Sequence, residues 1–471
     1  EERNFTIEPE DEPPAQSEYT QPDYIPEWTQ PTQPEEPEEG ETPAASGPNV
    51  MDIDFDALIA NETDSTLKDM HEYFRDRTPT EKNQYTGMFQ GKNLLLFTGE
   101  AFWIGAVNEQ YTPTLYKLAH SGFVFENFYN PLWYYSTVDG EYAATTGLIP
   151  TNQVNASQRY AGKNGVSMYF SMGNQLRALG YPTLAYHNNT ANYYDRNLSH
   201  PNLGYDFYAC DTGLDVAMTW PQSDLEMMQL TLPQALAGEK PFHNYYMTVS
   251  GHMNYSFAGN AMSAKHRDEV ADLDMSEAAR AYLACNMELD QALEYTIKTL
   301  EEAGELENTV IVLSGDHYPY GLDGTGAIDE LAGEGTEADP FEKYRSTLIL
   351  WSGDMEEPVV VDKPCYSVDI IPTLSNLFGL EYDSRLLAGR DILSDAPGLV
   401  IFNDYSYLTE LGRYNADTDT FTPNEGAQVP ENYAQDTYWE ARYIRSYSEK
   451  ILFNDYYRKI GLEPPAGPEE N

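Results

Sequence analysis

Residues 310–317 read Val-Ile-Val-Leu-Ser-Gly-Asp-His, and this stretch decides the fold class. Its β-branched, apolar start predicts a buried parallel strand, which delivers Asp316 and His317 side by side at its C-terminal end. Open α/β sheets bind their ligands at that end of their strands. An isolated Asp-His pair is more often a capped strand end with a solvated carboxylate. A metal site therefore requires support from a second strand.

Residues 93–100, Asn-Leu-Leu-Leu-Phe-Thr-Gly-Glu, repeat the pattern of a short apolar strand, a glycine and an acidic residue. More than two hundred residues separate the two strands, and that interval suits the crossover helices of a doubly wound sheet. The donor side chains of two such strands can converge on one cation. The sequence therefore predicts that Glu100, Asp316 and His317 lie together.

A third segment, residues 136–146, begins Ser-Thr-Val-Asp-Gly-Glu and is expected to form a helix. Thr137 stands at the predicted start of this helix, where threonine commonly caps the first turn. From this segment alone, capping is the simpler interpretation of Thr137.

Taken together, these motifs resemble the extracellular catalytic domain of lipoteichoic acid synthases, within the sulfatase and alkaline phosphatase superfamily. The resemblance extends from about Lys92 to about Asp404 and rests on motif order and spacing, since no single motif is decisive. It implies an α/β fold, with a sulfatase/alkaline-phosphatase-like sheet and flanking helices. The further segments that carry it are residues 186–189, 194–196, 203–206, 249–252 and 367–374.

The resemblance implies that Glu100, Thr137, Asp316 and His317 bind one divalent metal, and that Thr137 is also the nucleophile. Coordination to a dication lowers the pKa of a hydroxyl and holds it in line with phosphorus. Three oxygen donors and an imidazole fit manganese or magnesium, and we expect manganese. Zinc is the alternative metal. Residues 137–141 lack the Cys/Ser-x-Pro-x-Arg signature of sulfatase nucleophiles, so a sulfatase proper is disfavoured.

His252 follows a further apolar strand, and the resemblance places it beside the phosphate as a catalytic residue. There it could donate a proton to the leaving alcohol or hydrogen-bond a phosphate oxygen. His187 and Arg196 are weaker candidates for substrate binding. Arg196 could equally be an anchoring ion pair with an acidic residue.

Substrate identity is less constrained than reaction type. In the synthases, an Asp, a Trp five residues later and an Arg two beyond hold the glycerophosphate. Here the matching positions are Asp215, Trp220 and Gln222. Glutamine cannot form the charged, bidentate contact of an arginine with phosphate. Either another cation compensates, or the donor carries a different head group or makes fewer contacts.

Net charge and composition limit the partners and outline the domains. A formal net charge of -50 argues against nucleic acid and against a basic patch docking on anionic lipid. Residues 1–48, rich in Glu and Pro, are predicted to be a disordered spacer, with a binding arm for cations or basic partners as the alternative. The three cysteines match no metal spacing and allow at most one disulfide.

The spacer is expected to lead into N-terminal helices and an α/β catalytic domain over residues 49–387. A turn signal at 397–398 and an apolar run at 399–402 predict a small C-terminal α+β subdomain over residues 388–471. Its antiparallel part is expected to consist of short strands and turns and to include the aromatic stretch 438–447. The predicted helices span residues 52–77, 113–120, 172–179, 277–303 and 369–378.

The expected function is that of an extracellular phosphotransferase, which moves glycerophosphate from phosphatidylglycerol or a related anionic lipid to a cell-envelope glycolipid or polyol-phosphate acceptor. No apolar run reaches the ~20 residues of a membrane span. The chain begins with Glu1, so we expect a processed or excised fragment whose membrane segments are absent, at the outer face of a bacterial membrane or released from it. The alternatives are a phosphoethanolamine transferase, a phosphodiesterase, and a catalytically silent relative that binds polyol phosphate.

Overall fold

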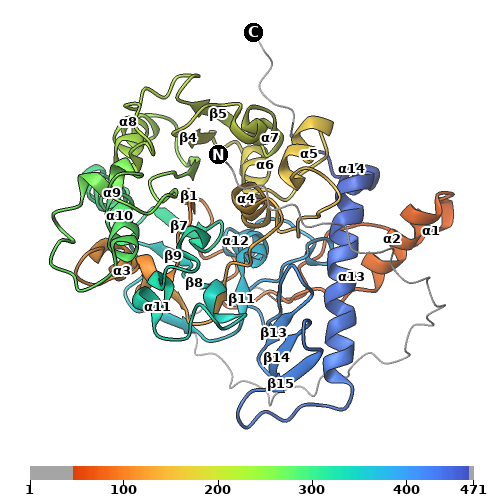
Figure 1. The fold of residues 1–471 in the computed structure, drawn as a ribbon. Helices are drawn as coiled ribbons and strands as arrows, with labels where there is room; N and C mark the ends of the chain where they lie inside the picture. The colour runs from red at the N-terminus through yellow and green to blue at the C-terminus, as the bar shows by residue number, and fades with distance from the viewer. Residues whose placement is uncertain (1–45, 466–471) are drawn as a thin grey trace, which may run out of the picture. The chain divides into compact units, whose positions relative to one another are not determined.

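A computed structural model describes residues 46–465, and its centre is a twisted, largely parallel sheet (Figure 1). In this range eight strands pair in the order β10-β2-β9-β7-β1-β6-β4-β5. Strand β1 (Asn93–Gly99) lies in parallel between β6 (His243–Met247) and β7 (Thr309–Gly315). Strands β4 (Thr183–His187) and β5 (Asp206–Ala209) continue the parallel part. The two strands predicted to carry the site are therefore direct neighbours.

The other edge of the sheet departs from the parallel pattern. Strand β9 (Ile349–Ser352) runs antiparallel to β7, and β2 (Phe123–Phe125) runs antiparallel to β9. Strand β10 (Val359–Val361) pairs in parallel with β2 at the end of the sheet. The predicted α/β sheet is thus confirmed. It is parallel at its centre, where the predicted site lies, and mixed toward this edge.

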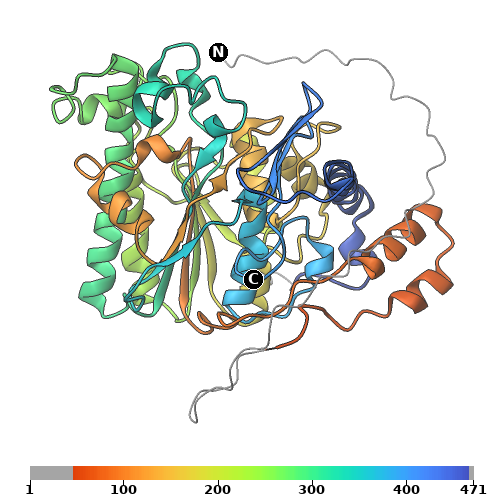
Figure 2. The ribbon, with the colours of Figure 1, turned by 90° about the horizontal axis from the view of Figure 1, so that it is seen from below.

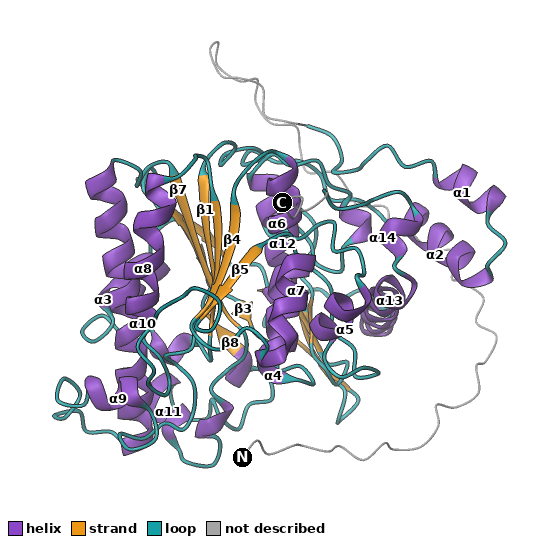
Figure 3. Ribbon diagram, turned by 90° about the horizontal axis from the view of Figure 1, so that it is seen from above, coloured by secondary structure: helices purple, strands orange, loops and turns teal. Residues whose placement is uncertain are grey.

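Helices cover both faces of the sheet (Figures 2 and 3). On one face lie α3 (Pro113–Ala119), α8 (Asp224–Ala237) and α10 (Glu277–Ala303). On the other lie α4 (Ser136–Thr146), α6 (Met172–Ala178), α7 (Arg196–Asn202) and α12 (Ile370–Leu377).

The core explains why the central strands are apolar without interruption. Leu94 and Leu96 of β1 pack into one hydrophobic cluster, and Leu95 and Phe97 pack into another on the opposite face. A strand buried on both faces needs apolar residues at consecutive positions. This is why the sequence shows runs rather than alternation.

Four short strands form a separate antiparallel sheet, in the order β12-β13-β14-β15, as predicted for the C-terminal part. The aromatic stretch 438–447 was expected among these strands and turns, and that expectation is wrong: it lies on helix α13 (Tyr433–Asn454). Tyr447 and Ile451, four residues apart, both reach the main core, so burial follows the helical period. The predicted boundary at residue 388 stays a prediction. The strands are β12 (Val400–Ile401), β13 (Tyr407–Thr409), β14 (Gly412–Asn415) and β15 (Thr420–Pro423).

The remaining elements are short. The predicted helix over 52–77 is divided in two, because Asp64 caps a second helix after a break. The remaining helices and strands are α1 (Phe55–Asn61), α2 (Ser65–Asp76), α5 (Ser157–Asn164), α9 (Ala261–Lys265), α11 (Ala327–Ala332), α14 (Tyr456–Lys459), β3 (Phe128–Tyr129), β8 (Arg345–Ser346) and β11 (Cys365–Tyr366). The 3₁₀ helices are η1 (Ile104–Ala106), η2 (Tyr193–Asp195), η3 (Tyr320–Leu322), η4 (Glu342–Tyr344), η5 (Ser367–Asp369) and η6 (Ser384–Leu386).

Two further expectations concern the ends and the cysteines. Residues 1–45 of the predicted spacer lie outside the described residues, and Pro48, at its predicted end, forms an isolated bridge with Glu81. The three cysteines are free. Between residues 46 and 465, no helix has the length and apolar character needed to cross a bilayer.

Candidate metal and nucleophile site

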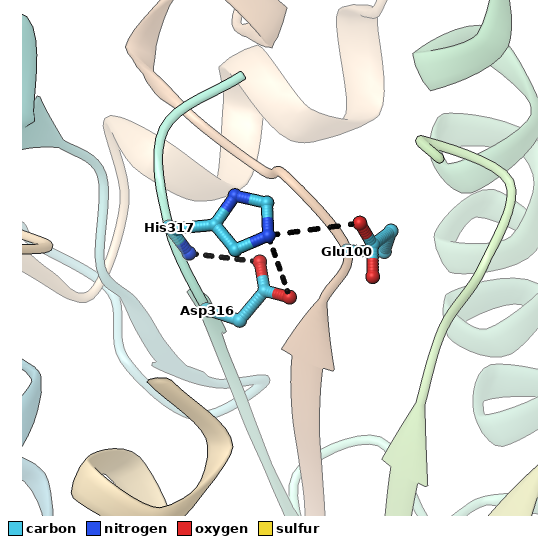
Figure 4. A group of neighbouring side chains, drawn as sticks. All are labelled: Glu100, Asp316 and His317. Carbon is cyan, nitrogen blue, oxygen red and sulfur yellow. Dashed lines mark hydrogen bonds and ion pairs between the residues drawn. The ribbon is translucent and has the colours of Figure 1, made fainter. Parts of the chain in front are cut away.

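The C-terminal ends of β1 and β7 bring Glu100, Asp316 and His317 together (Figure 4). The register pairs Gly99 with Gly315, so the residues that follow the two strands emerge at the same level. One donor atom from each of the three side chains lies within 4.8 Å of the others. His317 Nε2 is 3.8 Å from Glu100 Oε1 and 3.5 Å from Asp316 Oδ2. All three side chains are buried.

Thr137 is the fourth member of this cluster. Its Oγ1 lies 3.4 Å from Glu100 Oε2 and 3.3 Å from His317 Nε2. Helix α4 begins at Ser136, so Thr137 is inside the helix and the capping interpretation is wrong. The structure therefore brings together all four residues that the sequence proposed as metal ligands, and their ligand role stays a proposal.

Glycines allow the site-bearing segments to approach one another closely. A Cβ on Gly140 of α4 would lie 2.0 Å from the Asp316 carbonyl oxygen. A Cβ on Gly251 would lie 2.3 Å from the Glu100 carbonyl oxygen. Both distances are shorter than any real contact, so only glycine permits these two backbone approaches.

The donor groups fit a divalent cation. The backbone amides of Ala101 and His317 donate to Asp316 Oδ1, while its buried Oδ2 has no hydrogen-bond partner among the described residues. His317 Nδ1 lies 2.8 Å from the Tyr318 carbonyl, and a proton on Nδ1 that bonds this carbonyl leaves the lone pair of Nε2 facing the carboxylates. A vacant carboxylate oxygen and an imidazole lone pair directed at one point are typical metal ligands.

The electrostatics of the two carboxyl groups support the same conclusion. Burial, followed by the neighbouring Asp316 carboxylate, raises the pKa of Glu100 to about 8. Burial also raises the pKa of Asp316. Two buried like charges are unfavourable unless a cation offsets them.

His252 and Trp220, two further predicted site residues, contact each other. Their rings lie edge to face, with centroids 4.9 Å apart, and Trp220 is 44% exposed. The Asn260 side chain donates to the His252 carbonyl at 2.8 Å, and the amide of Ala261 donates to the Trp220 carbonyl at 2.9 Å. Asn260 was not predicted as part of this region, although an asparagine that precedes a short helix is a recognisable N-cap.

The other two residues of the predicted glycerophosphate subsite differ in exposure. Asp215 is exposed on the segment between β5 and α8. Gln222 is only 2% exposed, and its Oε1 lacks a hydrogen-bond partner within the described range. The structure thus places Trp220 against His252, and the roles of Asp215 and Gln222 stay predictions.

His187 and Arg196 contact each other in the protein interior. Arg196 is fully buried, with Nη2 3.0 Å from Glu141 Oε2 and Nη1 3.3 Å from His187 Nε2. Burial, followed by the Arg196 charge, holds the pKa of His187 well below its usual range, so His187 is neutral. The ion-pair interpretation of Arg196 is therefore confirmed. Its partner Glu141 was missed, because no local pattern marks a buried carboxylate.

The sequence is similar to those of known proteins. The lipoteichoic acid synthase-like YvgJ of Bacillus subtilis (strain 168) is 24% identical over 387 residues, which cover 79% of this chain and 61% of that protein. Lipoteichoic acid synthase 2 of the same organism is 24% identical over 423 residues, 85% of this chain and 62% of that protein. The chain thus spans about three fifths of the length of these relatives.

Structural similarity supports the same fold assignment. The lipoteichoic acid synthase LtaP from Listeria monocytogenes superposes with a TM-score of 0.69 at 22% identity, covering 82% of this chain and 98% of that one. A protein in the alkaline phosphatase superfamily from Vibrio parahaemolyticus gives 0.61 at 18% identity, covering 84% and 98%. The predicted fold class is confirmed. Because the profile of the family described as Sulfatase matches residues 92–380, more than half of the sequence, this chain belongs to the sulfatase family.

Proposed function

We propose that this chain is the catalytic part of a metal-dependent phosphotransferase in which Thr137 is the nucleophile. One observation carries the proposal: the Thr137 hydroxyl lies within 3.4 Å of both Glu100 and His317, in a buried cluster that contains a second carboxylate. A threonine hydroxyl beside carboxylates and an imidazole that can hold a dication can be activated to attack phosphorus. A structural threonine needs no such surroundings.

The residues divide the chemistry among them. A divalent cation held by the four clustered side chains would lower the pKa of the Thr137 hydroxyl and offset the phosphate charge, and manganese is the ion we propose. Thr137 Oγ1 attacks phosphorus, and the bond from phosphorus to the diacylglycerol oxygen breaks. His252 donates the proton that this leaving oxygen takes up. An acceptor hydroxyl then gives its proton to His252 and attacks phosphorus, the bond to Thr137 Oγ1 breaks, and the glycerophosphoryl group passes to the acceptor.

The orientation of His252 suits this role. Its Nδ1 lies 2.6 Å from the Met253 carbonyl, and a proton on Nδ1 that bonds this carbonyl fixes the orientation of the ring. The exposed face of Trp220 beside it offers an apolar wall for glycerol carbons. The two neighbouring side chains would therefore contact the same small head group.

We propose phosphatidylglycerol or a related anionic lipid as the donor, and a cell-envelope glycolipid or polyol phosphate as the acceptor, at the outer face of the membrane. This assignment is supported by the names of the relatives, one a lipoteichoic acid synthase and the other described as lipoteichoic acid synthase-like. Water as the acceptor would make the same site a phosphodiesterase.

A second candidate is a phosphoethanolamine transferase. It is favoured by Gln222, because a neutral amide stands where the synthases place an arginine. A catalytically silent, polyol-phosphate-binding relative is disfavoured, because the four residues of the cluster are both retained and brought together.

Intact-mass spectrometry tests the proposal. The protein is incubated with Mn²⁺ and either phosphatidylglycerol or phosphatidylethanolamine, and Thr137→Ala serves as the control. We expect a glycerophosphoryl adduct from phosphatidylglycerol in the wild type and none in the variant. An adduct from phosphatidylethanolamine alone would select the second candidate. The absence of both the adduct and diacylglycerol release with either lipid would reject the proposal.

A further inference from the structure

We propose that the buried ion pair of Glu141 and Arg196 is a positioning pair, which holds Thr137 Oγ1 against Glu100. This inference rests on the proposed function, because it concerns how the nucleophile is held. Neither residue reaches the cluster directly. Their effect passes through helix α4, which carries Thr137 and which the pair holds in place relative to strand β1.

Helix α4 carries both Thr137 and Glu141. Four residues separate them, so the two side chains project from the same face, one turn apart. Between them Gly140 lies against the backbone of Asp316. A rotation or shift of α4 would therefore move Thr137 relative to the carboxylates, and contacts at Glu141 oppose that movement.

The Glu141 carboxylate is bound on both oxygens. Oε2 accepts from Arg196 Nε at 3.1 Å and from Gln158 Nε2 at 3.0 Å, and Arg196 Nη2 lies 3.0 Å away. Oε1 accepts from the Tyr245 hydroxyl at 2.9 Å and lies 3.2 Å from His200 Nε2. These partners come from α5, α7 and β6, so three elements fix one carboxylate of α4.

The same network reaches the metal-bearing end of β1. The Tyr245 hydroxyl hydrogen-bonds Thr98 Oγ1 at 2.9 Å. The amide of Thr248 donates to the Thr98 carbonyl at 3.0 Å, and the amide of Glu100 donates to Thr248 Oγ1 at 3.0 Å. Glu141 is thus joined by hydrogen bonds to the segment that presents Glu100.

Stability alone is a weak reason for such a pair. Burial raises the pKa of Glu141, but Arg196, followed by His200, outweighs burial and holds this pKa well below its usual range. Both partners are therefore charged with no exposed surface. Replacing a buried ion pair with apolar residues of similar volume is often neutral or stabilising. A pair with several directional contacts instead fixes one orientation of the helix.

The test separates positioning from stability by removing both charges together. The variant Glu141→Leu/Arg196→Met is compared with the wild type in the full chain by thermal unfolding and by calorimetric titration with Mn²⁺. We expect the folded variant to bind Mn²⁺ about 10- to 100-fold more weakly, the range for residues that orient metal ligands. In a Thr137→Ala background, the same two changes should alter Mn²⁺ affinity less than twofold, because Glu141 acts through Thr137.

Two further variants keep the test decisive. If the paired variant does not fold, Tyr245→Phe removes only the hydroxyl between Glu141 and Thr98, and it should weaken Mn²⁺ binding severalfold, again only when Thr137 is present. Glu288→Gln neutralises another buried carboxylate, on α10, and should leave Mn²⁺ affinity within twofold of the wild type.

The readouts also separate this inference from the proposed function. The positioning role would be overturned if the paired variant bound Mn²⁺ with wild-type affinity. If the paired variant does not fold, wild-type affinity of Tyr245→Phe would overturn it instead. An equal loss with and without Thr137 would do the same. Because Mn²⁺ affinity needs no substrate, it decides the inference even if no lipid reacts. If a lipid does react, we expect the paired variant to lower kcat with KM unchanged.

Discussion

Replacing Gly140 with alanine should destabilise the protein and disable the site, although the residue lies inside helix α4. By helix propensity alone, alanine is favoured over glycine by about 1 kcal/mol. The structure predicts the opposite sign. The new Cβ would lie 2.0 Å from the Asp316 carbonyl oxygen, and its next neighbours are also backbone atoms of Asp316.

The size of the effect follows from that distance. A carbon and a carbonyl oxygen approach to about 3.3 Å, so α4 must move from the end of β7 by more than about 1 Å. Overpacking of this kind costs about 1 to 3 kcal/mol, which exceeds the gain in propensity. A displacement of about 1 Å at a reacting group can lower turnover by about 10²-fold. Mn²⁺ affinity should fall with it, since Thr137 and Asp316 move apart.

Urea unfolding, Mn²⁺ calorimetry and lipid turnover measure these three effects. Gly238→Ala is the matched control, because Gly238 has a negative φ and a new Cβ there would meet its nearest neighbour at an ordinary 3.4 Å. The control should keep wild-type Mn²⁺ affinity and turnover. If Gly140→Ala were as stable as the wild type and equally active, the close approach of α4 to Asp316 would not be a requirement of the site.

Four further predictions follow from named contacts. Because folding lowers the pKa of Glu141, this carboxylate contributes fully to the free energy of unfolding above pH 4.5, and its contribution is lost as pH falls below that value. The free energy of unfolding of Glu141→Gln should therefore fall less steeply in acid than that of the wild type. Excess Mn²⁺ at about 100 times Kd should stabilise the wild type by about 2.7 kcal/mol in thermal unfolding, and a chelator or Asp316→Asn should abolish this gain. Thr137→Ala should abolish turnover yet lose less than about 1 kcal/mol in urea unfolding, because Thr137 does not cap α4. Calorimetry with glycerol phosphate should show weaker binding for Trp220→Ala and binding strengthened by about 1 to 3 kcal/mol for Gln222→Arg; no change in either would place the substrate elsewhere.

Much of the fold could be predicted because its signals are local. The strands before Glu100 and Asp316 are continuous apolar runs that end in glycine and a donor, and the structure pairs them directly. Helix α10 has the predicted bounds, because Ser276 caps its start and Gly304, in the left-handed region, ends it.

The rest depended on contacts that no local pattern encodes. Glu141 and Arg196 are 55 residues apart, and neither shows in sequence that its partner will be buried with it. The aromatic stretch 438–447 has the composition of a strand, but packing of Ala441, Ile444 and Tyr447 along one face selects a helix. Tertiary packing therefore decided both points.

An anomalous-diffraction map from crystals grown with Mn²⁺ tests the central claim most directly. We expect one strong peak within about 2.0 to 2.3 Å of donor atoms from Glu100, Thr137, Asp316 and His317. A peak bound by other residues, or a well-ordered, Mn²⁺-saturated crystal with no peak between these four side chains, would contradict it.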